Sequence, residues 1–340
     1  MILFRCDASP QLGLGHLIRC RALAYALRKQ GQQCMMVGPP KIYMNAEDTK
    51  LFVVWETLKW ESVEADARCV AALVEHFSAA ILVLDDYRVD VDYQLLLRSR
   101  GLRWLQFETR TDRAIWADIV LNANPAVNSK EYASVLCNPN TKLLLGPHFA
   151  MLRPEFSDIN LKKYNPHIAR VMVTFGGGDD LGLTLFVLAT LLPVTPKHIE
   201  FVVMSGECNP RNSEITSWIQ DNGESRVIIE INPRNVASLI VSCDLAIMAG
   251  GSTIYEAACC GLNMILIATA ENQINQSNAW GMRMGIKYLG LKDDVSSDKL
   301  LDAFFLFYNN KNMYEISNKN EMTVDSKGAE RVCESILKLL

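Results

Sequence analysis

The sequence predicts two doubly wound α/β domains joined by a linker, and three observations support this fold class. Short apolar runs alternate with amphipathic stretches, which is typical of parallel strands covered by helices. The alternation stops over residues 147–167, a segment with three prolines and no clear period. Finally, 340 residues fit two domains of about 100 to 200 residues each.

The predicted first domain covers residues 1–146. Its apolar runs predict strands at Met1–Arg5, Gln33–Val37, Ala80–Leu84, Arg103–Glu108 and Ile119–Leu121. Its amphipathic stretches predict helices at His16–Gln30, Glu64–Phe77 and Val91–Arg100. Because strands and helices alternate, we expect one parallel sheet with helices on both faces.

The predicted second domain covers residues 168–340 and repeats this order. We expect strands at Ala169–Thr174, Ile199–Val203, Arg226–Ile231, Leu245–Met248, Met264–Ile267 and Ile286–Leu289. We expect helices at Leu181–Leu192, Ser213–Asp221, Val236–Ser242, Thr253–Cys260, Gln273–Met284 and Ala329–Leu340. Ligands of open sheets bind beyond the carboxyl ends of the strands, so functional residues are expected in the loops after the strands.

Composition and charge exclude several classes of protein. Lysine and arginine number 34 against 38 aspartate and glutamate residues, for a net charge of −4, which argues against electrostatic binding to nucleic acid or anionic lipid. The longest apolar stretch, Leu181–Leu192, is too short to span a bilayer. Because the start of the sequence shows no basic leader pattern, we expect a cytoplasmic protein with no membrane insertion. We also expect a monomer.

The cysteines and histidines do not predict a metal site. The 10 cysteines form no C-x-x-C pair, and the 5 histidines show no metal-ligand spacing. We therefore expect buried free thiols, no metal and no cofactor.

The loop after the first predicted strand runs from Asp7 to His16 and holds Gly13 and Gly15. Glycines permit a tight turn and close approach of a ligand, and the following helix directs its first amides toward the loop. The dinucleotide fingerprint would need a third glycine where Ile18 stands, so a dinucleotide is not expected.

His16 is the candidate catalytic residue, because imidazole titrates near neutral pH and can take a proton from water. The alternative is that His16 only caps the helix. Arg19 and Arg21 lie on the same predicted helix, where one of them would meet a substrate anion or both would be solvated.

Asp85, Asp86 and Tyr87 follow the strand predicted at Ala80–Leu84. Two carboxylates and a phenol at a strand end can orient His16 or bind sugar hydroxyls. The alternative is a helix cap or a solvated loop.

Two glycine-rich loops follow strands of the second domain. Gly176, Gly177 and Gly178 let backbone amides face an anion, although Asp179 and Asp180 oppose a phosphate unless they point away or cap the next helix.

The second of these loops, Ala249–Glu256, is the stronger candidate. Gly250 and Gly251 are followed by Ser252 and Thr253 at a helix start, where amides and hydroxyls converge as a diphosphate requires. Glu256 can accept hydrogen bonds from the two hydroxyls of a ribose. Ser252 or Thr253 would otherwise serve only as a cap.

The segment Glu271-Asn272-Gln273 follows another strand of the second domain, and its amide side chains can donate to phosphate or N-acetyl oxygens. Alone, it is an ordinary polar helix start.

Taken together, these blocks resemble two-domain nucleotide-sugar enzymes of the GT-B architecture, with two Rossmann-like domains facing a central cleft. The resemblance is greatest to the hydrolases of pseudaminic acid biosynthesis that act on UDP-2,4-diacetamido-2,4,6-trideoxy-β-L-altropyranose. It rests on RCDASPQLGLGHLIRCRALAYAL, DDY, LGPHFAMLRPEF, FGGGDD, AGGSTIYEA and ENQ, which extend from Arg5 to Gln273. The AGGSTIYE block is shared with glycosyltransferases that use UDP-GlcNAc.

The resemblance implies a metal-independent hydrolase that releases UDP and free 2,4-diacetamido-2,4,6-trideoxy-L-altrose, with His16 as general base for water. It also implies a role in a pathway that leads to flagellin glycosylation or to a surface polysaccharide. The expected substrate-binding residues are Gly13, Gly15, Arg19, Asp85, Tyr87, Gly176, Gly177, Gly250, Gly251, Ser252, Thr253, Glu256, Asn272 and Gln273. The tail after Leu291 matches no part of the pattern.

Three alternatives stay open. A GT-B glycosyltransferase with a UDP-N-acetylamino-sugar donor would use the same UDP site and need an acceptor. An enzyme similar to UDP-GlcNAc 2-epimerases would need more acid/base groups. A non-catalytic sensor would bind the nucleotide sugar but would have no use for His16.

Overall fold

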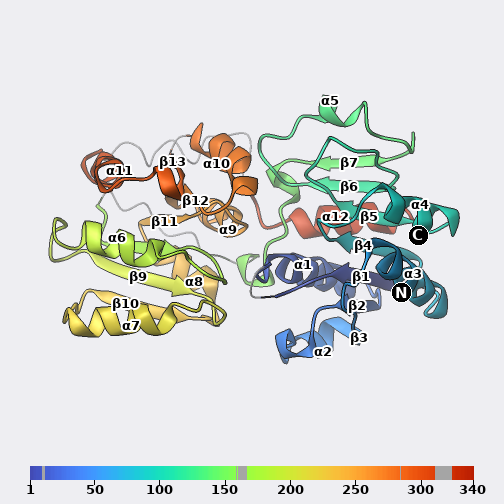
Figure 1. The fold of residues 1–340 in the computed structure, drawn as a ribbon, viewed down its shortest axis with the longest axis horizontal. Helices are drawn as coiled ribbons and strands as arrows, with labels where there is room; N and C mark the ends of the chain where they lie inside the picture. Colours follow the sequence, from blue (N-terminus) through green and yellow to red (C-terminus); the bar gives the residue numbers. More distant parts are fainter. Residues whose placement is uncertain (10–11, 158, 160–166, 284, 311–323) are drawn as a thin grey trace. The chain divides into compact units, whose positions relative to one another are not determined.

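The computed structural model describes residues 1–9, 12–157, 159, 167–283, 285–310 and 324–340 (Figure 1). The chain divides into two compact units. The first unit combines Met1–Pro154 with Val324–Leu340, and the second unit is Glu155–Thr323. Each unit contains one parallel sheet with helices packed on it.

The first unit has a seven-stranded sheet in the order β3-β2-β1-β4-β5-β6-β7. The strands are β1 (Ile2–Cys6), β2 (Cys34–Gly38), β3 (Phe52–Thr57), β4 (Ile81–Asp85), β5 (Trp104–Phe107), β6 (Ile119–Asn122) and β7 (Lys142–Leu145). The helices are α1 (Gly15–Lys29), α2 (Asp48–Leu51), α3 (Val63–His76), α4 (Val91–Ser99), α5 (Ser129–Tyr132) and α12 (Gly328–Leu337). All five predicted strands and all three predicted helices of this region are confirmed, with no end shifted by more than one residue.

Sequence analysis missed β3 and β7, which are the two edge strands of this sheet. A central parallel strand is buried on both faces and shows as a continuous apolar run, whereas an edge strand is partly exposed. In β3, buried Phe52 and Trp55 alternate with exposed Val53 and Glu56. β7 has only four residues and begins at the exposed Lys142. Neither strand therefore carries the signal that identified the central ones.

The second unit has a six-stranded parallel sheet in the order β10-β9-β8-β11-β12-β13. The strands are β8 (Arg170–Thr174), β9 (Glu200–Ser205), β10 (Val227–Ile231), β11 (Leu245–Ala249), β12 (Asn263–Ala268) and β13 (Ile286–Leu291). The helices are α6 (Leu183–Leu191), α7 (Asn212–Asp221), α8 (Val236–Val241), α9 (Thr253–Cys259), α10 (Ile274–Gly281) and α11 (Ser297–Asn309). Every strand predicted here is confirmed.

Helix α11 lies in the tail after Leu291, in a stretch for which the sequence analysis predicted no helix. It packs with α6 and buries Leu300, Phe304 and Phe307 in the core of the second unit.

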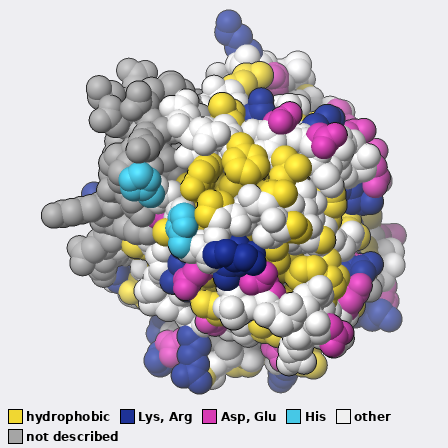
Figure 2. Space-filling view, turned by 90° about the vertical axis from the view of Figure 1, so that its left-hand side faces the viewer, with side chains coloured by type: hydrophobic (Ala, Val, Ile, Leu, Met, Phe, Trp, Pro, Cys, Tyr) yellow, Lys and Arg dark blue, Asp and Glu magenta, His cyan; other side chains and the backbone are white. Residues whose placement is uncertain are grey.

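Figure 2 shows hydrophobic side chains gathered on part of one face, with acidic and basic side chains both scattered around them. No single sign of charge dominates that face, in keeping with the small net charge.

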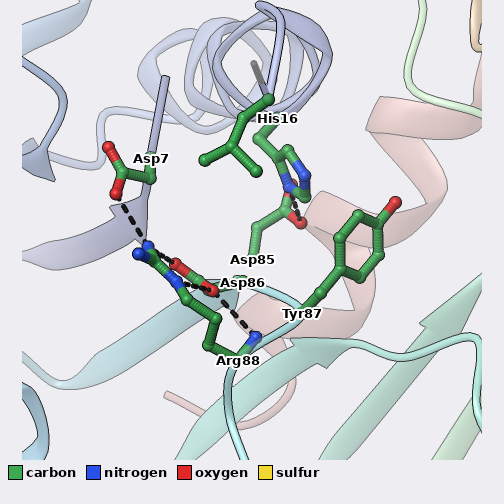
Figure 3. A pocket seen from close by; sticks show the side chains of 7 residues that line it. Asp7, His16, Asp85, Asp86, Tyr87 and Arg88 are labelled. Atoms are coloured by element: carbon green, nitrogen blue, oxygen red, sulfur yellow. Dashed lines mark hydrogen bonds and ion pairs between the residues drawn. The ribbon is translucent and has the colours of Figure 1, made fainter. Parts of the chain in front are cut away.

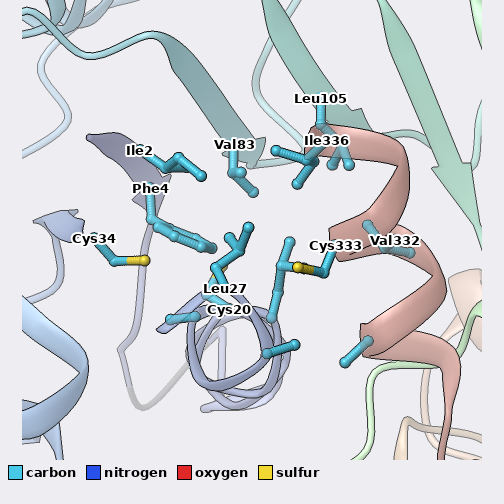
Figure 4. Packing of buried hydrophobic residues seen from close by; sticks show 14 of the residues in the cluster. Ile2, Phe4, Cys20, Leu27, Cys34, Val83, Leu105, Val332, Cys333 and Ile336 are labelled. Carbon is cyan, nitrogen blue, oxygen red and sulfur yellow. The ribbon is translucent and has the colours of Figure 1, made fainter. Parts of the chain in front are cut away.

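The final helix, α12, was expected in the second domain, and this prediction is wrong. It belongs to the first unit, where Val332, Cys333 and Ile336 pack against α1 and the sheet (Figure 4). The apolar stripe of a helix shows that it must cover a surface, but not which one. Here the open surface is that of α1, whose Cys20 and Leu27 face α12 in the core.

The predicted linker, residues 147–167, is described only in part, because residues 158 and 160–166 lie outside the described ranges. Its described part includes two short 3-10 turns, Pro147–Phe149 and Pro154–Phe156. The carboxylate of Glu155 accepts hydrogen bonds from the backbone amides of Val236 at 2.8 Å and Ala237 at 3.2 Å, and thereby caps α8.

Within the described residues, no helix combines the length and apolar composition that crossing a bilayer requires.

Candidate active site

The loops after β1 and β4 meet where the strand order of the first sheet reverses. β1 and β4 are parallel neighbours, and their register pairs Cys6 with Asp85, the last residue of each strand. The residues that follow, from Asp7 and from Asp86 onward, therefore leave the sheet side by side. Such a switch point is where open α/β sheets bind ligands.

His16 is the second residue of α1, which begins at Gly15. The residue at the N-cap is Leu14, so the interpretation of His16 as the helix cap is wrong. The turn before the helix requires Gly13, whose φ of +72° is unfavourable for other residues and whose N–H donates to the carbonyl of Ser9 at 2.8 Å. This turn brings the imidazole of His16 back over the end of β4.

His16 and Asp85 are joined by a hydrogen bond (Figure 3). The Nδ1 atom of His16 lies 2.7 Å from Oδ1 of Asp85, and both side chains are more than nine-tenths buried. Burial by itself raises the pKa of the Asp85 carboxyl, but Arg19 and His16 together hold it well below its usual range. Asp85 is therefore an ionised acceptor, so Nδ1 is the donor in this hydrogen bond, and in the neutral ring the lone pair is on Nε2. An imidazole held in this way is ready to accept a proton at Nε2.

Arg19 lies one helical turn after His16 and also binds Asp85. Its Nε and Nη2 atoms donate to the two carboxylate oxygens, in the bidentate geometry that suits arginine. The guanidinium also stacks over the ring of Phe107, 4.8 Å from its centre. Arg19 was expected to bind substrate, and in this structure these donors are directed at Asp85.

Asp86 was considered as a helix cap, and the structure assigns that task to Asp90, which accepts from the amide of Tyr93 at 2.9 Å. Asp86 instead binds Arg88, whose Nε donates to Oδ1 at 2.9 Å. Arg88 also donates to Asp7 at 2.7 Å and thus ties the loop after β1 to the loop after β4.

Sequence reasoning missed Arg88 and Trp60. The Arg88 guanidinium lies 4.1 Å from the centre of the Trp60 ring. The position of Arg88, two residues after Asp86, could have indicated the ion pair between them. Nothing in the sequence connects Trp60 to this loop.

Tyr87 completes the pocket. Its ring meets that of His16 edge to face, with 4.7 Å between the ring centres, and the residue is 42% exposed. The pocket is small, with a cavity volume of about 30 Å³, and is lined by Asp7, Leu12, His16, Asp85, Asp86, Tyr87 and Arg88. Ligand sites for whole drug-sized molecules span about 300 to 1,000 Å³, so this pocket suits one part of a larger ligand.

The sheet of the second unit reverses its strand order between β8 and β11, so the loops after these strands are also neighbours. After β8, Asp179 and Asp180 accept hydrogen bonds from the amides of Leu181 at 2.9 Å and Gly182 at 3.0 Å. These bonds form turns before α6, whose N-cap is Gly182 and which has no side-chain cap, so the expectation that these aspartates cap the helix is wrong. Gly176 has a φ of +99° within this loop.

The loop after β11 packs tightly on α10. A Cβ atom at Gly250 would lie 2.1 Å from Oγ of Ser277 and 3.0 Å from Cβ of Gln273. The carbonyl of Gly250 accepts from Nε2 of Gln276 at 2.9 Å, and Oε1 of Gln276 accepts from Tyr255 at 2.8 Å. Sequence reasoning missed Gln276, although it lies one turn after Gln273 on the same helix.

The helix after this loop, α9, begins at Thr253 with Ser252 at the N-cap position. Among the described residues, the Ser252 side chain makes no capping hydrogen bond. Ser252 is exposed and Gly251 and Thr253 are half-buried, whereas Glu256 is only 5% exposed.

The segment after β12 contributes Asn272, which is exposed, and Gln273, which is half-buried. The Oε1 atom of Gln273 accepts from the backbone amide of Thr269 at 2.9 Å and from its hydroxyl at 3.1 Å.

The expected residues fall into two groups. His16, Arg19, Asp85 and Tyr87 meet in the first unit, and the loops after β8, β11 and β12 are adjacent in the second unit. In the part of the chain that the structure describes, no three histidine, cysteine or acidic side chains are grouped so as to hold a metal ion.

Comparison with curated proteins finds relatives over most of the chain. A UDP-2,4-diacetamido-2,4,6-trideoxy-β-L-altropyranose hydrolase of Campylobacter jejuni is 24% identical over 277 residues, which are 80% of this chain and 93% of that protein. The chain resembles this hydrolase. The spore coat polysaccharide biosynthesis protein SpsG of Bacillus subtilis is also 24% identical, over 310 residues that make up 87% of this chain and 85% of that one. No family model matches the sequence.

Solved structures confirm the GT-B fold. MurG of Acinetobacter baumannii superimposes with a TM-score of 0.66 at 14% identity and covers 99% of both chains. At this identity the likeness establishes the fold and not the activity.

Proposed function

We propose that this protein is a nucleotide-sugar hydrolase that cleaves UDP-2,4-diacetamido-2,4,6-trideoxy-β-L-altropyranose to UDP and the free sugar. The observation that carries the proposal is the hydrogen bond between His16 and Asp85, which leaves Nε2 of His16 as a base in a pocket. The resemblance to the Campylobacter hydrolase supports the choice of substrate.

In the proposed reaction, Nε2 of His16 takes a proton from a water molecule as its oxygen attacks the anomeric carbon. The bond between that carbon and the diphosphate oxygen breaks, and UDP leaves with the bonding electrons. Asp85 fixes the orientation and tautomer of the ring, because it accepts the hydrogen bond from Nδ1 and leaves Nε2 to take the proton. A diphosphate is already a good leaving group, so the enzyme has only to activate water and stabilise the departing charge.

Binding of UDP is assigned in this proposal to the loops of the second unit. Gly250, Gly251, Ser252 and Thr253 would hold the diphosphate through amides and hydroxyls, and Glu256 would accept from the ribose. Gly176, Gly177, Asn272 and Gln273 would border the same ligand. In the first unit, Gly13, Gly15 and Tyr87 would face the sugar. The absence of a metal requirement, the cytoplasmic location, the monomeric state and the link to flagellin stay predictions.

The decisive experiment follows the proposed substrate by NMR with purified protein, chelator and no acceptor. We expect UDP and free sugar to appear together, with the anomeric signals of the sugar reporting cleavage. An unchanged substrate that turns over only when an acceptor is added would support the glycosyltransferase alternative. Conversion to an isomeric UDP-sugar would support the epimerase alternative, and binding without any product would support the sensor.

A further inference from the structure

We propose that Arg19 is a positioning residue: by occupying the carboxylate of Asp85, it disfavours the protonated form of the His16 imidazole, so that the ring is available to accept a proton. This inference rests on the proposed role of His16 and revises the expectation that Arg19 binds a substrate anion. The juxtaposition that carries it is a single carboxylate shared by one guanidinium and one imidazole.

The ionised carboxylate of Asp85 favours a proton on Nδ1 of His16. Oδ1 of Asp85 accepts from Nδ1 of His16 and from Nη2 of Arg19, while Oδ2 accepts from Nε of Arg19. Nη2 of Arg19 also lies 3.0 Å from Nδ1 of His16. Since Nδ1 already carries a proton for Asp85, the contact between Nη2 and Nδ1 brings two donors together and is repulsive.

The consequence for His16 follows from the charges. An unpaired carboxylate next to an imidazole favours the protonated ring, because opposite charges attract. Here Arg19 neutralises Asp85, and Nη2 of Arg19 lies 3.0 Å from Nδ1 of the ring, only slightly farther than the carboxylate oxygen at 2.7 Å. The imidazolium therefore gains little from Asp85, while the neutral ring keeps its hydrogen bond and its orientation.

The other charged groups around His16 do not replace Arg19. From the loops after β1 and β4, Asp7 and Asp86 face the pocket, and both bind Arg88. Tyr87 meets the ring edge to face, and Cys20 on α1 lies 3.9 Å from Asp85, where burial raises its pKa well above the usual thiol range. Among these described groups, Arg19 is the one cation within hydrogen-bond distance of the imidazole.

Burial supports a fixed role for Arg19. The Asp85 side chain is 1% exposed and that of Arg19 is 24% exposed, so solvent screens the pair weakly. Phe107 supports the guanidinium from one side, and the Tyr87 ring centre lies 6.0 Å away. The hydrogen bonds to Asp85 and the contact of the guanidinium plane with Phe107 together leave Arg19 little freedom to turn toward a ligand.

The test is an NMR titration of the five histidine side chains without substrate, with His16→Asn used to identify the His16 signal. In Arg19→Gln we expect the titration midpoint of His16 to rise by about one pH unit, because Asp85 is no longer neutralised. Arg19→Lys retains the charge and should stay near the wild-type midpoint. A midpoint that is unchanged or lowered in Arg19→Gln overturns the proposal.

Arg21 provides a matched control on the same helix. It binds Asp48 with the same bidentate geometry, at 2.7 Å and 2.6 Å, but does not contact His16. Arg21→Gln therefore removes an equivalent ion pair and should leave the His16 midpoint unchanged; an equal shift in this variant would also overturn the proposal. If Arg19→Gln does not fold, Arg19→Met removes the charge while preserving the apolar contact with Phe107.

Enzyme kinetics separate this inference from the proposed function. If His16 is the base, the acidic limb of kcat/KM should move to higher pH in Arg19→Gln, in parallel with the NMR midpoint. If no variant turns over the UDP-sugar but the midpoint still moves, Arg19 controls His16 while the proposed reaction fails. If turnover is present and the midpoint does not move, the inference on Arg19 fails alone.

Discussion

The two units have the same kind of strand reversal, yet the loops at these reversals differ in chemistry. In the first unit, the loops after β1 and β4 bring together His16, Asp85 and Arg19, with a second set of charges at Asp86 and Arg88. In the second unit, the loop after β11 contains glycines and hydroxyls and is held by amide side chains of α10. One framework therefore provides both a set of titratable groups and a set of backbone donors.

On the proposed function, this difference divides the reaction into two tasks. Proton transfer needs a titratable group fixed by charged partners, as in the first unit. Binding of an anion needs backbone amides and hydroxyls that approach closely, which glycines permit. On this comparison, changes in the first unit should alter turnover, and changes in the second unit should alter affinity for UDP.

The largest expected effect is that of His16→Asn. Loss of a general base typically lowers turnover by about 10²- to 10⁴-fold. Because the UDP site is assigned to the other unit, the dissociation constant for UDP, measured by calorimetry, should stay close to that of the wild type. Turnover near the wild-type rate would remove His16 from the mechanism, and a parallel loss of UDP affinity would break the division between the units.

A second prediction separates the stability of the two units through α12. Ile336 is fully buried against the first unit, and truncation of such a side chain costs about 2 to 5 kcal/mol. In Ile336→Ala, hydrogen exchange should accelerate in β1, β4 and α1 and stay unchanged in β8 to β13. Leu340→Ala is the control, because Leu340 is 48% exposed and its loss should change stability little. Faster exchange confined to the second unit would contradict the assignment of α12.

A third prediction concerns the close contact between Gly250 and Ser277. In Gly250→Ala the new methyl group collides with the Ser277 hydroxyl, so stability should fall by about 1 to 3 kcal/mol and UDP should bind more weakly. Chemical denaturation and calorimetry measure the two effects. Gly251→Ala is the control for stability, since a Cβ there meets nothing within 4 Å.

The double variant Gly250→Ala, Ser277→Ala makes this prediction sharper. Removing the Ser277 hydroxyl takes away the atom with which the methyl group collides, so part of the lost stability should return. A double variant no more stable than Gly250→Ala would show that Ser277 is not the obstacle.

The smallest expected effect is a pH dependence of stability. The pKa of Asp85 is held well below that of an unfolded aspartate, so its ion pair contributes fully above about pH 4. As the pH falls below that value, the unfolded chain takes up the proton first and the contribution decreases. The stability difference between wild type and Asp85→Asn, measured by urea denaturation, should therefore narrow between pH 5 and the lowest pH at which both fold. A constant difference would mean that the depressed pKa does not contribute to stability.

The sequence by itself determined which segments form the central strands and which loops follow them. Buried parallel strands such as β4 and β11 need continuous apolar runs, and a chain that turns at their ends needs glycine or aspartate there. These are local requirements, so they are visible in the sequence at Asp85 and at Gly250. The placement of His16 near Asp85 was predictable for the same reason, because both follow strands that end at one edge of the sheet.

Only the tertiary structure decided which groups are partners. Two arginines one turn apart look alike in sequence, yet Arg19 binds Asp85 while Arg21 binds Asp48 on another segment. In the same way, the apolar stripe of α12 fits either core, and packing against α1 decides that it belongs to the first unit. Contacts between residues far apart in the chain depend on how whole elements pack, and no local pattern of residues encodes that choice.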